Sequence, residues 1–191
     1  QEGGSALDFD GSDDYVDCGN DADLQMGTHD LTVEFWLKTS SSAVQKIIAN
    51  GASTTSTAGY AIKMLSDGRL RVEFNNGTTT GNSRNTAITV NDGNWHHVAV
   101  MFDRDGQLTI CVDGATCVTK DISSLSDLNF DNTTSTFVMG RNATSNSNNS
   151  FTGILDEVRI WSAALSEATF EEWMYKPIES GHSNYANLEA Y

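Results

Sequence analysis

The stretch HHVAVMFDRDGQLTICV, residues 96–112, contains two runs with strand-like periodicity, residues 96–102 and residues 108–112. Alternation with a period of two is typical of a β-strand that covers a core on one face. Between the runs lies Asp105-Gly106, and an Asp-Gly dipeptide readily supplies the positive φ angles of a tight turn. The stretch is therefore predicted to form a β-hairpin.

Further runs of the same kind lie on both sides of this hairpin: residues 31–38 (LTVEFWLK), 60–65 (YAIKML), 70–74 (LRVEF) and 154–161 (ILDEVRIW). Clusters of Gly, Asn, Asp and Ser separate them. About a dozen short strands joined by such turns are typical of an all-β sandwich. We therefore predict an all-β fold built from two antiparallel sheets.

Residues 166–174 (SEATFEEWM) depart from the strand pattern. Ser166 is a good helix N-cap residue, and a glutamate follows it in the first turn. The apolar residues Phe170, Trp173 and Met174 have helical spacing, and Pro177 follows them. One short C-terminal helix is predicted here.

The chain is short and strongly acidic. Its 191 residues suit one domain, and 26 Asp and Glu against 11 Lys and Arg give a formal net charge of −15. Such a charge repels phosphate backbones and anionic lipid surfaces, which excludes nucleic-acid binding and docking to anionic membranes. No apolar run approaches the roughly 18 residues of a membrane-spanning helix, so no membrane insertion is expected. Gln1-Glu2-Gly3-Gly4 is not a secretory leader, so we expect either a removed signal peptide or an excised module.

Several segments together resemble the laminin G-like domains of the concanavalin A-like lectin/glucanase superfamily. They are residues 6–16 (ALDFDGSDDYV), 33–38 (VEFWLK), 94–100 (NWHHVAV), 108–114 (LTICVDG) and 151–161 (FTGILDEVRIW), in the family's order. The resemblance implies a two-sheet antiparallel jelly-roll sandwich. It further implies that residues 1–191 are one domain of a larger secreted or cell-surface protein, because the tail resembles a strand that leads onward in multidomain members.

Aspartate is concentrated near the N-terminus, from Asp8 to Asp23. The family places a structural Ca²⁺ between an Asp-Gly-x-x-Asp loop and an aspartate of the last long strand. By resemblance the ligands are Asp10, Asp14 and Asp156, with Asp13 as an alternate. Asp156 also has the parity of its strand's apolar residues, so it is expected to face the core, where an unpaired charge is costly. The alternative is that Asp156 caps loop amides and the other aspartates are solvated.

Basic side chains gather in the hairpin around Asp67-Gly68. Lys63, Arg69 and Arg71 lie there with Glu73, and Arg141 is a further candidate from a later strand. Such a group can hold an acidic polysaccharide through paired guanidinium–carboxylate contacts. The alternative is ordinary cross-strand charge pairing with Glu73.

The three cysteines divide into a pair and a single residue. Cys111 and Cys117 lie opposite each other if the intervening turn has three residues, and they miss if it has two. A disulfide is predicted, which indicates an oxidising compartment. Cys18 is left over and is expected to be buried.

No arrangement of residues indicates catalysis. His96 and His97 are adjacent on a strand, so they point to opposite faces, and no zinc-ligand spacing accompanies them. Asp156 and Glu157 are adjacent as well, whereas a retaining glycosidase needs two carboxylates on one face. Trp36 lies on the opposite face from Phe35, where it is either covered by the helix or a stacking platform for a sugar.

The sequence therefore predicts a non-catalytic, calcium-stabilised, extracellular module that binds a polysaccharide or other glycan, possibly an acidic one. It would be attached to a polysaccharide-degrading enzyme or an adhesin. The alternative function is an adhesion or spacer domain that binds protein or has no ligand.

Overall fold

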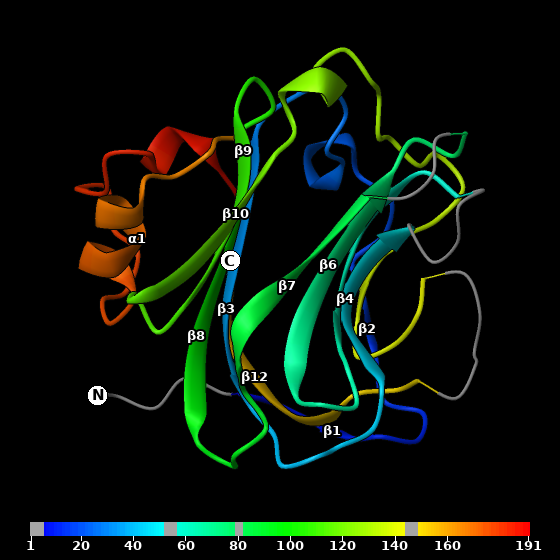
Figure 1. The fold of residues 1–191 in the computed structure, drawn as a ribbon. Coiled ribbons are helices and arrows are strands. Elements are labelled where there is room, and N and C mark those ends of the chain that lie inside the picture. Colours follow the sequence, from blue (N-terminus) through cyan, green and yellow to red (C-terminus); the bar gives the residue numbers. More distant parts are fainter. Residues whose placement is uncertain (1–5, 52–56, 79–81, 144–148) are drawn as a thin grey trace.

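Two antiparallel β-sheets face each other in the computed structural model, which describes residues 6–51, 57–78, 82–143 and 149–191 (Figure 1). Within these residues sheet A has the spatial order β1 (Leu7–Asp10), β12 (Thr152–Trp161), β3 (Leu31–Lys38), β8 (Trp95–Phe102), β9 (Gln107–Val112) and β10 (Thr116–Asp121). A short strand, β13 (Leu188–Ala190), also pairs with β12.

Sheet B has the order β2 (Val16–Asp17), β11 (Phe137–Met139), β4 (Gln45–Gly51), β5 (Gly59–Met64), β6 (Arg69–Asn75) and β7 (Asn82–Thr89). The chain crosses between the sheets several times, for example from β3 to β4 and from β7 to β8. The described residues also form three 3₁₀ turns outside the sheets, at Ala22–Leu24, Ser123–Leu125 and Tyr185–Asn187. The architecture is the predicted two-sheet jelly-roll sandwich.

The core lies between the sheets and follows the alternation of the strands. In β3 the side chains of Val33, Phe35 and Leu37 are fully buried between the sheets. Phe102 of sheet A meets Phe74 of sheet B edge-on, with ring centroids 5.5 Å apart. Inward-facing apolar residues of both sheets therefore form one continuous core, as expected for sheet-on-sheet packing.

The helix α1 (Glu167–Trp173) covers the outer face of sheet A, on the side away from sheet B (Figure 1). Ser166 is its N-cap, and the Ser166 hydroxyl accepts a hydrogen bond from the Thr169 backbone N–H. Phe170 is completely buried against Ala99, Met101 and Cys111 of the sheet. The predicted helix is confirmed. None of the helices in the described ranges is long and apolar enough to cross a membrane.

The disulfide between Cys111 and Cys117 is also confirmed. The two residues are paired directly across β9 and β10, with Cα atoms 4.1 Å apart. The loop from Asp113 to Ala115 has three residues, of which Asp113 and Gly114 have positive φ angles. The three-residue turn therefore sets the register that brings the two sulfur atoms together.

A β-bulge in β12 changes the predicted facing of this strand. Asp156 pairs with Trp36, whereas Arg159 pairs with Glu34, so two residues of β12 lie opposite Phe35 alone. Glu157 occupies the bulge with a φ angle of 50°. Before the bulge Leu155 is the core residue, so Asp156 lies on the outer face beside Trp36 and does not face the core. The expected core-facing Asp156 is therefore wrong, because the bulge shifts the parity of the strand.

Candidate functional site

The outer face of sheet B carries a group of charged side chains from three adjacent strands. Lys63 of β5 lies between Lys46 of β4 and Arg71 of β6 in the strand register. These residues share the face opposite the core because their neighbours Ile62 and Val72 are buried inside. Strand alternation therefore places three cations next to one another.

Glu73 holds two of these cations at once. Lys63 Nζ lies 2.5 Å from Glu73 Oε1, and Lys46 Nζ lies 3.4 Å from Glu73 Oε2. The side chains are largely covered, with exposed fractions of 7% for Lys46, 18% for Lys63 and 22% for Glu73. Burial lowers the pKa of Lys46, an effect that Glu73 opposes and Lys63 reinforces. One carboxylate thus serves two ammonium groups in a partly desolvated place.

Arg71 extends the group toward β7, where its Nε donates to Asn85 Oδ1 at 2.8 Å. We define the cationic face as Lys46, Lys63, Arg71, Glu73 and Asn85. Three cations accompany one carboxylate there, whereas the whole chain has a formal charge of −15. The face is therefore a local exception to the charge of the molecule and is suited to attract an anionic group.

The other two predicted cationic residues, Arg69 and Arg141, have partners outside the cationic face. Arg69, the first residue of β6, donates from Nε and Nη2 to Oδ2 of Asp67 in the preceding turn, at 2.9 and 2.7 Å. Arg141 follows β11, and its guanidinium lies 3.4 Å from the centroid of the Tyr15 ring. The structure brings together Lys63, Arg71 and Glu73, and Arg69 lies next to Arg71 on the same face of β6 but is bound by Asp67.

Lys46 and Asn85 were missed by the sequence prediction. Residues 45–51 (QKIIANG) do not alternate, because a register shift falls between Lys46 and Ile48. A bulge of this kind interrupts the alternation of side chains, so a period of two no longer predicts which face of the sheet a residue is on. The sequence did offer one signal for Lys46, because it is the last basic residue before the β5–β6 hairpin.

The N-terminal aspartates form a second cluster, on the loop after β1. Carboxylate oxygens of Asp10, Asp13 and Asp14 lie within 4.8 Å of one another, and all three residues are exposed. Asp10 Oδ1 accepts from the Ser12 N–H at 2.7 Å, and Asp14 Oδ2 accepts from the Asp10 N–H at 2.9 Å. In ligand type and spacing the three carboxylates fit a hard cation such as Ca²⁺, which takes oxygen ligands.

Asp156 lies apart from these three carboxylates. Asp10 pairs with Thr152, which is four positions before Asp156 in β12. The Asp156 carboxylate accepts from the Glu157 N–H at 2.9 Å inside the bulge. This backbone contact corresponds to the alternative in which Asp156 caps a loop amide.

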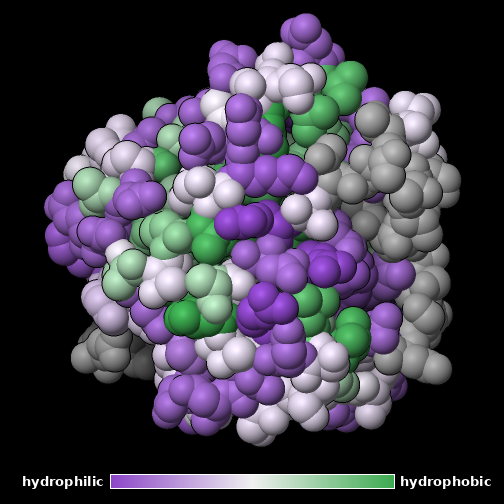
Figure 2. All heavy atoms as spheres, in the orientation of Figure 1, coloured by the Kyte–Doolittle hydropathy of each residue, from purple (hydrophilic) through white to green (hydrophobic). Residues whose placement is uncertain are grey.

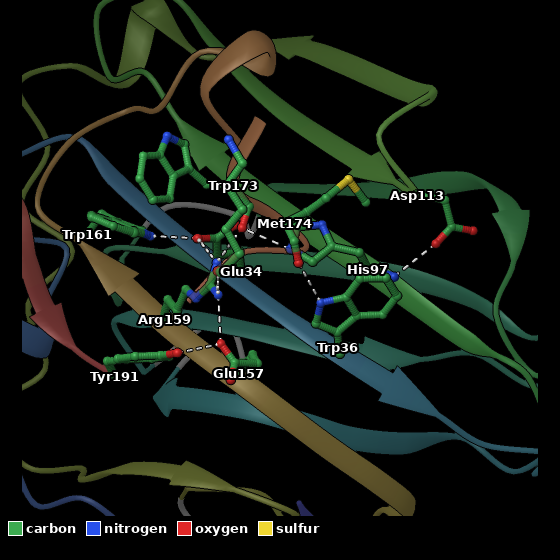
Figure 3. Close-up of polar contacts among 11 residues, drawn as sticks. Glu34, Trp36, His97, Asp113, Glu157, Arg159, Trp161, Trp173, Met174 and Tyr191 are labelled. Carbon is green, nitrogen blue, oxygen red and sulfur yellow. Dashed lines mark hydrogen bonds and ion pairs between the residues drawn. The ribbon is translucent and has the colours of Figure 1, made fainter. Parts of the chain in front are cut away.

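A buried ionic network lies under α1, on the outer face of sheet A (Figure 3). Glu34 Oε1 accepts from Trp161 Nε1 at 3.1 Å and lies 3.5 Å from Arg159 Nη1. Glu34 Oε2 lies 3.3 Å from His97 Nε2. Burial favours a higher pKa for Glu34, but the His97 hydrogen bond and the charges of Arg159 and His97 outweigh it, so the pKa is lowered.

The same network also forms hydrogen bonds with the segment at the end of α1. Arg159 donates to the carbonyl oxygens of Trp173 and Lys176, at 3.3 and 2.9 Å. Trp36 Nε1 donates to the Met174 carbonyl at 3.0 Å, and the Trp36 ring contacts those of His97 and Tyr175. Trp36 is therefore covered by the segment around Met174 and Tyr175 and is not an open stacking platform for a sugar.

The two adjacent histidines have different carboxylate partners, as opposite facing requires. His97 contacts Glu34 in the network, whereas His96 lies between Asp113 and Asp92, at 2.8 and 3.0 Å. Burial favours a lower pKa for His96, but the hydrogen bonds and charges of the two aspartates outweigh it and raise the pKa. Both rings have structural partners in the described part of the chain.

Known proteins place this arrangement in a wider context. The family model for the concanavalin A-like lectin/glucanases superfamily matches residues 10–169. No curated protein matches the sequence.

Solved structures share the fold at low sequence identity. A putative carbohydrate binding protein from Bacteroides ovatus has a TM-score of 0.72 and 20% identity, over 96% of this chain and 49% of that one. The binding domain of Paraclostridial Mosquitocidal Protein 1 has a TM-score of 0.70 and 15% identity, over 88% of this chain and 44% of that one. A SAP-like pentraxin from Limulus polyphemus has a TM-score of 0.65 and 19% identity, over 87% and 81%. The chain spans about half the length of the first two.

Proposed function

Because the chain belongs to the concanavalin A-like lectin/glucanase superfamily, we propose that it is a non-catalytic carbohydrate-binding module of a larger extracellular protein. The cationic face is its glycan-binding surface. The disulfide between Cys111 and Cys117 supports an oxidising, extracellular setting. Two structural neighbours, the carbohydrate binding protein from Bacteroides ovatus and the binding domain of Paraclostridial Mosquitocidal Protein 1, support binding without catalysis.

One observation carries the choice of surface, namely that Glu73 is shared by Lys46 and Lys63 beside Arg71. The single carboxylate leaves an excess of positive charge, and partial burial strengthens the attraction for an anion because water screens it less. An arginine and a lysine on one flat sheet face suit a carboxylate, with hydroxyl groups bonding to Asn85. The ligand class is therefore an acidic polysaccharide, such as one that contains uronic acids.

We further propose that one Ca²⁺ binds to Asp10, Asp13 and Asp14 and stabilises the loop after β1. The mutual approach of three carboxylates to within 4.8 Å supports this, because a cation removes their repulsion. Backbone carbonyl groups and water would complete the six to eight oxygens that Ca²⁺ takes. Its role is structural, since the loop belongs to sheet A and the cationic face to sheet B.

An array of neutral and acidic glycans, probed with the whole chain in calcium, tests the proposed function. Retention on uronic-acid polymers, and much weaker retention on neutral polymers of the same length, is expected. Moderate salt should reduce it, because the interaction is electrostatic. Retention on no glycan would contradict the proposal and favour the adhesion or spacer function.

A further inference from the structure

The edge of sheet A next to β12 is interrupted. β1 pairs with β12 from Thr152 to Leu155, and β13 pairs with it only at Ile160 and Trp161. Over residues 156–159, which include the bulge, no strand in the described part of the chain pairs with this side of β12. The side of the sandwich is therefore open between β1 and β13.

A cavity of about 430 Å³ lies behind this opening, between the two sheets. Its walls are mainly apolar: Leu7, Leu155 and Ile160 come from sheet A, and Phe137 and Met139 come from sheet B. The volume falls in the range of about 300–1,000 Å³ that small-molecule pockets occupy. The cavity is large enough for a short alkyl chain or an aromatic ring.

Leu7 indicates that the apolar wall is accessible from outside. It pairs with Leu155, which is fully buried in the core, so Leu7 has the facing of a core residue. Nevertheless 38% of Leu7 is exposed. Cys18, which was expected to be buried, is exposed and lines the same cavity, because it follows the two-residue strand β2 at the edge. The thiol is partly shielded from water although the residue is exposed, and this desolvation and the charge of the neighbouring Asp17 raise the pKa of Cys18.

The rim of the cavity is acidic. Glu157 and Asp156 line it, and Glu157 Oε2 accepts hydrogen bonds from Tyr191 Oη at 2.6 Å and Arg159 Nη2 at 2.7 Å (Figure 3). Arg159 is the cation of this group, and it is shared with Glu34, so two carboxylates accompany one guanidinium. Glu157 also has the left-handed φ angle of 50°, a conformation that is costly for a residue other than glycine. An acidic, strained group therefore borders an apolar cavity.

We propose that this edge cavity binds a cationic amphiphile, a molecule with a short alkyl or aromatic part and an ammonium head. The apolar part fills the space between Leu7, Leu155 and Phe137, and the ammonium lies at the carboxylate of Glu157. The net charge of −15 steers cations toward the molecule and repels amphiphiles with anionic heads. This site lies on another part of the sandwich than the cationic face and takes the opposite charge, so it does not depend on the proposed glycan function.

The experiment uses n-octylammonium as the probe and octyl sulfate as the control, both below the concentrations at which they form micelles. Cys18 reports occupancy, since the other two cysteines form the disulfide and only Cys18 can react with iodoacetamide in the unreduced protein. Octylammonium should slow this reaction at least fivefold in a saturable way. Octyl sulfate should leave it within twofold of the free rate. No protection by octylammonium, or equal protection by octyl sulfate, would overturn the proposal.

Two variants test the location. Leu7→Trp fills the mouth of the cavity and should weaken octylammonium binding, measured by calorimetry, at least tenfold. Val44→Trp changes an equally exposed apolar residue outside the cavity lining and should bind within twofold of wild type. Ala190→Trp fills the opposite side of the mouth and replaces the first variant if that one does not fold. Unchanged affinity in a folded variant of either filling position would overturn the assignment.

Discussion

Arg159 and Glu34 form an ion pair inside the protein, with Nη1 and Oε1 separated by 3.5 Å and side chains that are 2% and 1% exposed. They lie opposite each other on β12 and β3. Arg159 also donates hydrogen bonds to the backbone carbonyl groups of Trp173, at the end of α1, and of Lys176 beyond it. The network therefore holds the C-terminal part of the chain against sheet A. The network stabilises the fold only while every partner is present, because an uncompensated buried charge is costly.

Glu34→Gln should strongly destabilise the fold. Removing the charge takes from Arg159 the more deeply buried of its two carboxylate partners and leaves Glu157 alone to balance it, so the free energy of unfolding should fall by about 3–5 kcal/mol. Urea unfolding at pH 7 measures this. Glu172→Gln, which breaks the exposed pair with Lys176, is the control and should cost less than about 0.5 kcal/mol. Equal losses in the two variants would contradict the role of the network.

The same residue predicts a dependence on acid. The folded state lowers the pKa of Glu34, so its contribution to stability is present above the ordinary value of about 4.3 and is lost as the pH falls through the lowered value. The stability difference between wild type and Glu34→Gln should therefore shrink below pH 4. A difference that stays constant down to the acid transition would contradict the lowered pKa.

His96 predicts the opposite dependence. Asp113 and Asp92 raise its pKa above the usual value of about 6.5, so its contribution to stability is complete below that value and is lost as the pH rises through the folded pKa. Nuclear magnetic resonance titration of the imidazole measures the pKa directly. In Asp113→Asn the His96 midpoint should move down. A midpoint in wild type at or below that of a histidine in an unfolded peptide would refute the arrangement.

The features that the sequence predicted correctly depend on short-range patterns. The pairing of Cys111 with Cys117 needs only the strand period and a turn of three residues, both of which are local. The helix after Ser166 likewise has its start signal and its apolar spacing in one segment. The two-sheet fold adds only the repetition of strands and turns.

The missed features depend on irregular backbone. A bulge at Glu157 reverses the facing of Asp156, and the register shift after Lys46 conceals its place on the cationic face. Neither position has a glycine that would mark it. The parity of the strand places Arg69 with Arg71, but it does not indicate that the guanidinium of Arg69 is paired with Asp67.

Reduction of the disulfide should weaken the protein moderately. The loop that it closes is short, so the expected loss is about 2 kcal/mol on the loop-entropy account. The double variant Cys111→Ala, Cys117→Ala should show this loss in urea unfolding, whereas Cys18→Ala should change stability by less than about 0.5 kcal/mol. A full loss of folding in the double variant would mean that the turn itself depends on the bond.

Calcium should raise the melting temperature, and a chelator should lower it. Binding only to the native state adds about 2.7 kcal/mol at a hundredfold excess over Kd. Asp14→Asn should abolish the response to chelator, while Asp156→Ala should retain it, because Asp156 lies away from the aspartate loop. Identical melting curves for wild type with and without chelator would contradict the calcium proposal.

The surface in view along the edges of β6 and β7 is predominantly hydrophilic, with apolar residues in small separate patches (Figure 2). Such a surface suits a hydrated ligand rather than an apolar partner.

The most direct test of the central proposal is a calorimetric titration of a uronic-acid polymer into wild type and three variants. The account predicts that Lys63→Gln and Arg71→Gln each weaken binding at least tenfold. Arg69→Gln, whose guanidinium is held by Asp67, should bind within twofold of wild type. Equal weakening in all three would mean that only overall charge matters, and unchanged binding in Lys63→Gln and Arg71→Gln would contradict the assignment of the glycan to the cationic face.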